Sequence, residues 1–481
     1  MTHNKFLPRV IAAAAAMMLL AGCGSKADPG FSPANPVNIT IWTYYNGEQL
    51  EAFNALVDEF NSTVGKEQGI TVESSSHGSV TDLENNVLAS AEGKVGAEAM
   101  PNIFSAYADT AYALDEMGQI ADLSDYLSEE DRAAFIEDYL SEGDFSGSGS
   151  IKIFPVAKSA ELLFLNETDW EPFAAATGAT YDDLATIEGL VSVAERYYEW
   201  TDAQTPDIPN DGRAFFGRDA MANYMLIGAK QLDCTIFDAQ DGSMTLNFDH
   251  DAVRTLWDNY YVPFIKGYFS ASGRFRSDDV KTGNIIAYVG SSSSTTFFPT
   301  QVIADDMDSH DITRKALESP KFANGEDYAV QQGAGMVVTK ASDAEIQASL
   351  VFLKWFTSPE HNITFSVDSG YLPVTHEGNS IDAIRISGLA LSDEMDEVLS
   401  AAVDTVNENH LYTPRAFSGG TNARAILEYS MSDKASADRA AVKEAMAQGQ
   451  SFEDASAQFL SDECFEAWYQ DTLASLEAFQ G

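Results

Sequence analysis

Residues 42 to 48, Trp-Thr-Tyr-Tyr-Asn-Gly-Glu, combine flat aromatic rings with polar groups directly after a short apolar stretch. Aromatic rings suit the C–H faces of a sugar, and amide and carboxylate groups suit its hydroxyl rim. We therefore expect ligand contacts from Trp42, Tyr44, Asn46 and Glu48. The competing interpretation is that the rings pack beneath a following helix and that Asn46 only forms a turn.

Tyr107 and Asp109 pair an aromatic ring with a carboxylate at the end of another short apolar stretch. The sequence contains no Gly-x-Ser-x-Gly elbow, no zinc signature and no cysteine–histidine arrangement. A glycoside hydrolase needs two carboxylates at a fixed separation, and nothing in the sequence singles out such a pair. The residues favour binding over catalysis and predict no cofactor and no metal ion. A glycosidase and a purely structural surface protein remain the competing classes.

Regular elements are expected to carry these side chains. Val37 to Ile41 alternate with polar residues, which predicts a strand, and Leu50 to Phe60 have the apolar spacing of a helix. Further strands are expected over 70–73 and 102–107, and further helices over 81–91 and 110–117. This order predicts an α/β fold with a mostly parallel sheet. Ligands of such sheets collect beyond the carboxyl ends of the strands, where Tyr44 and Tyr107 lie.

The second half of the chain offers local signals of the same kind. Residues 151–166 predict a buried strand, and residues 333–338 a strand flanked by glycines. Ser342 and Glu345 have the spacing of a capping box, and Pro359 suits the first position of a helix. From residue 380 onward the chain is predicted to be mostly helical.

Acidic residues far outnumber basic ones, with 74 Asp and Glu against 28 Lys and Arg and a net charge of -46 in 481 residues. Such a surface repels nucleic acid and anionic lipid headgroups, so neither is an expected partner. The length suggests two or more lobes. Cys234 and Cys464 could form a disulfide in an oxidising compartment, and two free thiols are the alternative.

The N-terminus predicts export and anchoring. Lys5 and Arg9 precede an apolar run, residues 11–20, that is too short to span a bilayer. The run ends in Leu-Ala-Gly-Cys at residues 20–23, which resembles the lipobox of bacterial lipoproteins. The resemblance implies a signal peptide over 1–22, lipid on Cys23 and a flexible tether over 23–35. The protein is therefore expected outside the cytoplasm, held to the cell membrane by its lipid.

Four stretches together resemble the extracellular solute-binding proteins of ABC importers, in the branch of the maltose- and glycerol-phosphate-binding proteins. They are the lipobox, ITIWTYYNGEQLEAFNALVDEF at 39–60, KIFPVAKSAELLFLN at 152–166, and GAGMVVTK…FLKWFTSPEHN…SGYLPV at 333–374. The resemblance implies a monomeric, non-enzymatic protein with a two-lobe periplasmic-binding-protein-like fold of type II, a hinge between the lobes and a permease partner. Lobe one would take 36–152 and 331–371, and lobe two 153–330 and 372–481.

The same resemblance adds residues to the predicted binding site. It implies contacts to a carbohydrate-type solute from Ser159 in the hinge, Ser292 and Ser293 in a serine-rich loop, the backbone at Gly333, Tyr371 and Arg415. The glycerol-phosphate-binding branch has an arginine in a place comparable to that of Arg415, and a guanidinium suits a phosphate oxygen pair, so the resemblance makes glycerol phosphate or a related ester the alternative ligand. However, Ala108 follows Tyr107, where the glycerol-phosphate branch has a glutamate.

Overall fold

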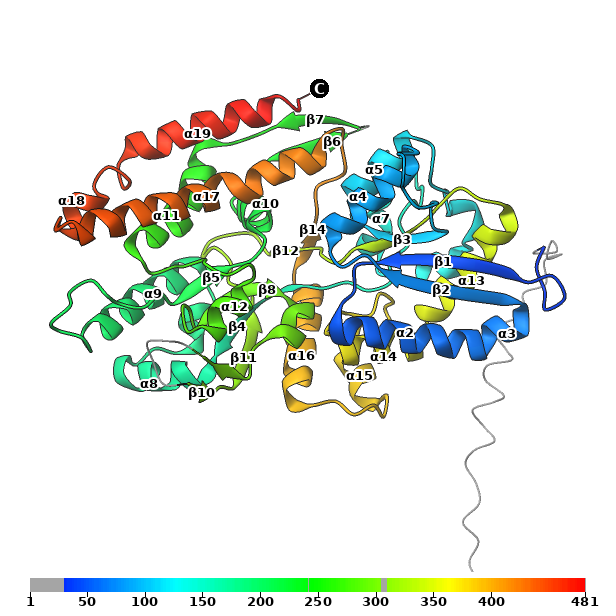
Figure 1. Ribbon diagram of the computed structural model, residues 1–481, viewed down its shortest axis with the longest axis horizontal. Helices are drawn as coiled ribbons and strands as arrows, with labels where there is room; N and C mark the ends of the chain where they lie inside the picture. The colour runs from blue at the N-terminus through cyan, green and yellow to red at the C-terminus, as the bar shows by residue number, and fades with distance from the viewer. Residues whose placement is uncertain (1–29, 241, 304–308, 481) are drawn as a thin grey trace, which may run out of the picture.

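Two four-stranded sheets lie on opposite sides of the molecule (Figure 1). The computed structural model describes residues 30–240, 242–303 and 309–480, so the predicted signal peptide and Cys23 lie outside the described residues. The first sheet has the order β13-β3-β1-β2 and the second the order β11-β4-β8-β5. Their strands are β1 (Val37–Thr43), β2 (Ile70–Ser76), β3 (Ile103–Ala106), β13 (Gly335–Val338), β4 (Glu161–Asn166), β5 (Phe216–Arg218), β8 (Ala287–Ser291) and β11 (Arg314–Glu318).

In each sheet, the strand that arrives from the opposite lobe runs against the others. β13 is antiparallel to β3 at the edge of the first sheet, where β1 pairs in parallel with β2 and β3. β4 lies inside the second sheet and is antiparallel to both β8 and β11. The prediction of a mostly parallel sheet is therefore right for the first lobe and wrong for the pairings of the second. The reason is the interior position of the reversed strand, which turns two of that sheet's three pairings antiparallel.

Helices cover the first sheet as the local sequence signals predict. α2 (Gly47–Ser62) buries Phe53, Leu56, Val57 and Phe60. α13 (Asp343–Phe356) begins with the capping box of Ser342 and Glu345, and α14 (Pro359–Ser369) begins at the proline. The other helices of this side are α3 (Val64–Gln68), α4 (Val80–Ala91), α5 (Ala108–Glu116), α6 (Glu129–Ala133), α7 (Glu137–Ser141), α15 (Ile381–Ile386) and the 3-10 turn Ser124–Tyr126.

The second sheet lies among longer helices, and the region after residue 380 is mostly helical as predicted. The helices of this side are α8 (Glu167–Thr177), α9 (Ile187–Asp202), α10 (Met221–Gln231), α11 (His250–Lys266), α12 (Arg276–Lys281), α16 (Asp393–Glu408), α17 (Gly420–Ala447), α18 (Phe452–Ser456) and α19 (Asp462–Glu477). Two 3-10 helices, Tyr181–Leu184 and Ser292–Phe297, and the strand pairs β6 (Phe237–Gln240) with β7 (Ser243–Leu246), β9 (Gln301–Val302) with β10 (His310–Asp311), and β12 (Tyr328–Val330) with β14 (His410–Tyr412) complete it.

The segment that crosses between the lobes differs from its prediction. Only Glu161–Asn166 of the stretch 151–166 forms a regular strand. The residues before it make isolated bridges to three separate positions, Phe154 to Met336, Lys158 to Leu372 and Ser159 to Gln332. Pro155 has no N–H to donate, and the partners change from one residue to the next, so no continuous ladder forms.

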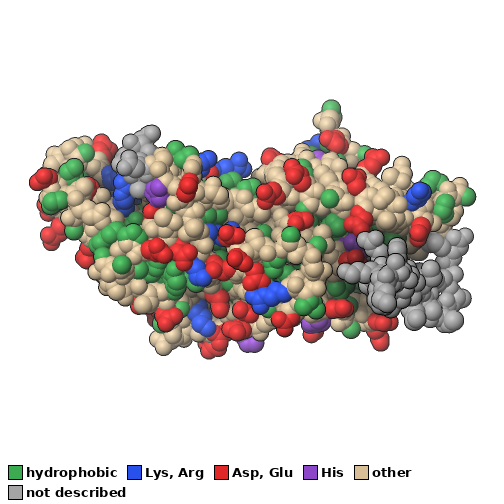
Figure 2. Space-filling view, turned by 90° about the horizontal axis from the view of Figure 1, so that it is seen from below, with side chains coloured by type: hydrophobic (Ala, Val, Ile, Leu, Met, Phe, Trp, Pro, Cys, Tyr) green, Lys and Arg blue, Asp and Glu red, His purple; other side chains and the backbone are tan. Residues whose placement is uncertain are grey.

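The surface carries the acidic excess that the composition predicts. Acidic side chains are scattered over the face drawn in Figure 2, with fewer lysines and arginines between them. No helix within the described residues is long and apolar enough to cross a membrane. Cys234 and Cys464 are both free thiols, which resolves the alternative left open by the sequence.

Candidate functional site

A cleft runs between the two lobes and has two parts that meet at Val80 and Thr81, in the first turn of α4. The first part, here called the aromatic chamber, has a volume of about 990 Å³. Its lining includes Tyr44, Asn46 and Gln49 from the first lobe and Asp219, Arg274, Phe275, Ser293, Phe297 and Phe298 from the second. The second part, the acidic chamber, has a volume of about 470 Å³ and is lined by Glu84, Tyr107, Asp109, Glu142, Asn223, Gln331, Arg424 and Glu428, among others.

Tyr44 lines the aromatic chamber. It is the first residue after β1, which ends at Thr43, and it therefore lies at the carboxyl edge of the first sheet. Its hydroxyl lies 3.3 Å from that of Tyr371, which follows the left-handed Gly370 at the end of α14. Burial, followed by the nearby tyrosine hydroxyls, raises the pKa of Tyr44, and burial raises that of Tyr371. Both phenols therefore keep their protons and can donate hydrogen bonds.

The serine-rich loop closes the aromatic chamber from the second lobe. The Ser293 carbonyl accepts a hydrogen bond of 3.0 Å from the Gln49 side chain of α2. The Ser292 hydroxyl donates to the Gly370 carbonyl at 2.9 Å. These bonds join the two lobes, so the loop holds them together beside the ligand space. Ser293 lines the chamber, whereas Ser292 is fully buried behind it.

Asp109 is the best-defined acidic group of the acidic chamber. It lies in the first turn of α5, where a carboxylate interacts favourably with the helix dipole. Burial raises the pKa of Asp109 to about 6, with Arg424 acting in the opposite direction and Glu84 and Glu142 adding to the rise. Glu84 accepts a hydrogen bond of 2.9 Å from Thr110, and burial raises its pKa too.

A buried polar chain holds Arg424 in the acidic chamber. Arg424 donates to the Asn223 side-chain oxygen, and the Asn223 amide donates to Glu161 at 2.8 Å. Glu161 is buried and also accepts a hydrogen bond of 2.8 Å from Arg218. Because each link is made to a buried partner, the guanidinium is oriented before any ligand arrives.

Lys158 forms an ion pair at the hinge, directly beside the acidic chamber. Its side chain has no solvent exposure, pairs with Glu142 and donates to the Gly333 carbonyl at 2.8 Å. Gly333 has a φ of +93°, and a Cβ there would lie 2.8 Å from the Ala157 carbonyl. The close approach of two crossing backbones is thus sufficient to require a glycine at position 333.

The structure brings together five of the residues that the sequence selected. Tyr44, Asn46 and Ser293 line the aromatic chamber, and Tyr107 and Asp109 line the acidic one. The other selected residues lie outside both linings: Trp42, Glu48, Ser159, Ser292, Gly333, Tyr371 and Arg415.

These outlying residues have specific surroundings. Trp42 is 6% exposed, with its ring 4.3 Å from that of His77, which matches the packing interpretation. Tyr371 lies behind Tyr44, and the Ser159 hydroxyl is buried with no hydrogen-bond partner among the described residues. Glu48 and Arg415 are exposed to solvent.

Several lining residues escaped the sequence reasoning. Arg424 and Glu428 lie four residues apart on one face of α17, a spacing that was available in the sequence but carried no motif. Phe275 precedes a short helix and lies next to no recognisable signal. Arg274 lines the aromatic chamber and is conspicuous in the sequence as a basic residue of an acidic chain. Other arginines of that region have internal partners: Arg218 pairs with Glu161, and Arg276 pairs with Asp279 at 2.7 Å.

Solved structures with this fold extend over most of the chain. One is the cyclic α-maltosyl-1,6-maltose binding protein of Arthrobacter globiformis, at 17% identity, a TM-score of 0.66, and coverage of 92% of this chain and 100% of that one. A second is UgpB of Mycobacterium tuberculosis in complex with glycerophosphocholine, at 16% identity, a TM-score of 0.63 and coverage of 92% and 99%. A third is the GacH receptor of Streptomyces glaucescens, solved unliganded and with acarbose, at 13% identity, a TM-score of 0.62 and coverage of 90% and 98%.

These likenesses confirm the two-lobe fold of type II periplasmic binding proteins. No curated protein sequence matches the chain. The profile of the family described as bacterial extracellular solute-binding protein matches residues 55–384. This range is more than half of the chain, so the protein belongs to that family and is an extracytoplasmic solute-binding protein.

Proposed function

We propose that this solute-binding protein captures a carbohydrate-type solute in the cleft between its lobes and delivers it to the permease of an ABC importer. The observation that carries the proposal is the mixed lining of the aromatic chamber. Tyr44, Phe275 and Phe298 offer apolar rings, and Asn46, Gln49 and Ser293 offer polar groups beside them. This combination suits a ligand with C–H faces and a hydroxyl rim.

The protein binds its solute without reacting with it, as a monomer whose lobes close by a hinge motion. The hinge consists of the crossings near Ser159, Gln332 and Leu372. We place the lobe boundaries near 152–153 and 330–331, as the sequence predicts. The backbone of residues 374–376 is hydrogen-bonded to residues 134–136, which favours a last boundary after residue 376 rather than at 371.

We further propose that lipid on Cys23 holds the protein to the membrane and that the residues between Cys23 and residue 30 act as its tether. The predicted flexible tether over 23–35 is too long, because Phe31 is buried in the core and the backbone of Ser32 pairs with that of Asn35. A tethered binding protein stays near its permease, whereas a free one diffuses away from a cell without an outer membrane. Cys23→Ala is expected to release the protein into the medium with unchanged ligand affinity. Loss of affinity in the released protein would contradict a purely anchoring role.

A phosphate ester is the second candidate, because one similar structure was solved with glycerophosphocholine. The charges of the cleft favour it less. Arg415, the arginine that suggested a phosphate, is exposed and outside both linings. The acidic chamber has four carboxylates, which repel a phosphate.

Calorimetry with a panel of oligosaccharides and glycerol phosphate tests the proposal, with X-ray scattering to follow closure. We expect heat and compaction with an oligosaccharide, and an affinity about tenfold or more weaker in Tyr44→Ala, which removes a ring from the chamber. Tyr126→Ala is the matched control, because Tyr126 bonds to Asp343 far from the cleft. Glycerol phosphate as the tightest ligand would favour the second candidate. Absence of both heat and compaction with every solute would reject the function itself.

A further inference from the structure

The two chambers of the cleft differ in their charge. The aromatic chamber is balanced, because two carboxylates face two cationic side chains: Asp219, Asp278, Arg274 and Lys281. Within the described residues, the acidic chamber has four carboxylates and one cation in its lining: Glu84, Asp109, Glu142, Glu428 and Arg424. The excess of negative charge is therefore confined to one end of the ligand space.

Internal partners account for part of this excess. Glu142 is paired with Lys158, and Glu428 accepts a hydrogen bond of 2.8 Å from the backbone N–H of Ala222 at the start of α10. Within the described ranges, the one hydrogen bond to the Glu84 side chain comes from the neutral hydroxyl of Thr110, and the Asp109 side chain accepts none. Glu84 and Asp109 thus remain as two carboxylates that no cation of the described part of the chain contacts.

Gln331 is a second and independent sign of a ligand at this end. Its side chain lines the same chamber and is only 7% exposed. Its amide nitrogen has no hydrogen-bond partner among the described residues. A buried donor without an acceptor is unfavourable, and an oxygen of a bound solute would satisfy it.

We propose that the solute carries a protonated amino group, which lies beside Asp109 and Glu84 while a solute oxygen accepts from Gln331. The inference rests on the proposed function, since it concerns the same cleft, and it narrows the ligand to an amino sugar or an oligosaccharide that contains one. Burial raises the pKa of both carboxyl groups, because it removes water that stabilises the carboxylate form. A bound ammonium group would stabilise the carboxylate form in place of that water.

Calorimetry at pH 6.5, where the amino groups of glucosamine carry more charge than at neutral pH, tests the inference with matched series of two to four sugar units: glucosamine, N-acetylglucosamine and glucose oligosaccharides. We expect the glucosamine series to bind at least about tenfold more tightly than the other two, because it alone offers a charged hydrogen-bond donor. Asp109→Asn should remove that advantage. Glu84→Gln removes the neighbouring carboxylate, should have the same effect, and serves as the test if Asp109→Asn folds poorly. Glu116→Gln removes a charge at the exposed end of the same helix and should keep the advantage.

A pH series adds a readout that depends on ionisation. Glucosamine binding should weaken from pH 6.5 to pH 5, because Asp109 becomes protonated over a range in which most of the amino groups of the ligand already carry their proton. Glu84, Glu142 and Arg424 are the charged groups that face Asp109, and Glu84 contributes in the same direction. Equal binding of the three series, or a preference for the neutral ones, would overturn the amino-group inference and leave solute capture intact. No heat and no compaction with any series would overturn both.

Discussion

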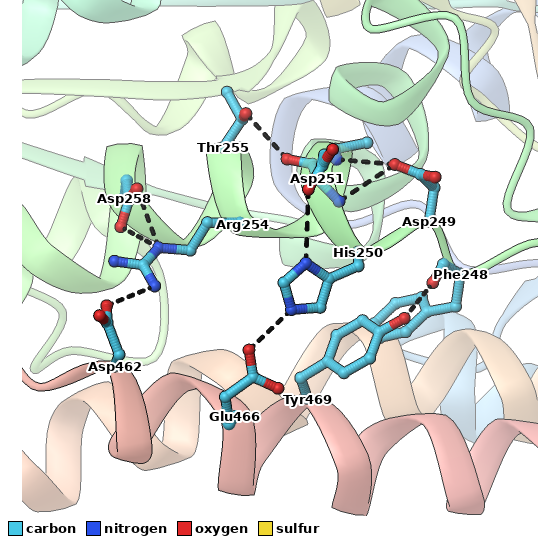
Figure 3. A network of polar contacts seen from close by, with 11 residues as sticks. Phe248, Asp249, His250, Asp251, Arg254, Thr255, Asp258, Asp462, Glu466 and Tyr469 are labelled. Carbon is cyan, nitrogen blue, oxygen red and sulfur yellow. Dashed lines mark hydrogen bonds and ion pairs between the residues drawn. The ribbon is translucent and has the colours of Figure 1, made fainter.

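The acidic chamber and the contact between α11 and α19 use charged residues in opposite ways. At the second place, here called the α11–α19 contact, His250 and Arg254 lie between carboxylates that pair with them, while Asp249 accepts from backbone N–H groups at the start of α11 (Figure 3). His250 bonds to Glu466 at 2.7 Å, and Arg254 bonds to Asp258 and Asp462 at 2.9 and 2.8 Å. These side chains are exposed or partly exposed, so water screens both attraction and repulsion.

In the acidic chamber, Asp109 and Glu84 are partly buried and have no contacting cation among the described residues. Burial makes an unpaired charge costly, whereas exposure makes it nearly neutral. An unpaired carboxylate on the surface therefore needs no explanation, whereas one in the cleft indicates a candidate ligand contact. The comparison teaches that the degree of burial and pairing, rather than the number of acidic residues, singles out the carboxylates that are candidates for ligand binding.

The largest effect is expected where a buried ion pair next to the cleft is broken. Lys158→Met leaves Glu142 buried without its cation and should lower the free energy of unfolding by about 3–5 kcal/mol. Chemical denaturation measures this loss. Lys94→Met removes the partner of Glu92 in an exposed pair and should change stability by less than about 1 kcal/mol. Equal effects of the two variants would remove the distinction between buried and exposed charges.

A second variant sharpens the electrostatic account of the chamber. Arg424 lowers the pKa of Asp109, so Arg424→Gln should raise that pKa above about 6. Carboxyl-carbon NMR of the unliganded protein follows the titration directly. Arg254→Gln at the α11–α19 contact should leave the pKa of Asp109 unchanged. A pKa that stays constant or falls in Arg424→Gln would show that Arg424 does not act on Asp109.

A smaller effect is expected for the tyrosine pair at the edge of the aromatic chamber. Tyr371→Phe removes the hydroxyl contact with Tyr44 and should cost about 1 kcal/mol of stability. Tyr44→Phe should cost a similar amount, and the double variant should cost less than the sum, because both single changes remove one shared contact. Strictly additive losses, measured by denaturation, would mean that the two hydroxyls are not coupled.

The smallest effect is expected at the α11–α19 contact. The hydrogen bond that the His250 ring donates to Glu466 is the main cause that raises the pKa of His250. The stabilisation from this hydrogen bond is fully present below the pKa that His250 has in the unfolded protein. It is lost as the pH rises through the higher pKa that His250 has in the folded protein. Exposure limits it to a few tenths of a kcal/mol. Denaturation at pH 5 and pH 9 should show His250→Gln slightly less stable than the parent at pH 5 only, whereas exposed His376→Gln should show no such difference. A larger deficit at pH 9 would reverse the assignment.

Local chemistry allowed much of the fold to be predicted. The capping box of Ser342, the proline that begins α14 and the apolar face of α2 all depend on residues close in sequence. The crossing segment was less predictable, because its partners are Met336, Gln332 and Leu372, far along the chain. The interior position of β4 also depends on distant pairings with β8 and β11.

The binding site divides in the same way. The sequence by itself determined that aromatic and polar residues leave β1 and β3 at their carboxyl ends, so Tyr44, Tyr107 and Asp109 were within reach of reasoning. Only the tertiary structure decided that Trp42 turns into the core, that Arg415 stays outside, and that Arg424 faces Asp109 across the cleft. The physical reason is that strand ends follow from local backbone preferences, whereas burial and charge pairing depend on groups that folding brings together from hundreds of residues apart.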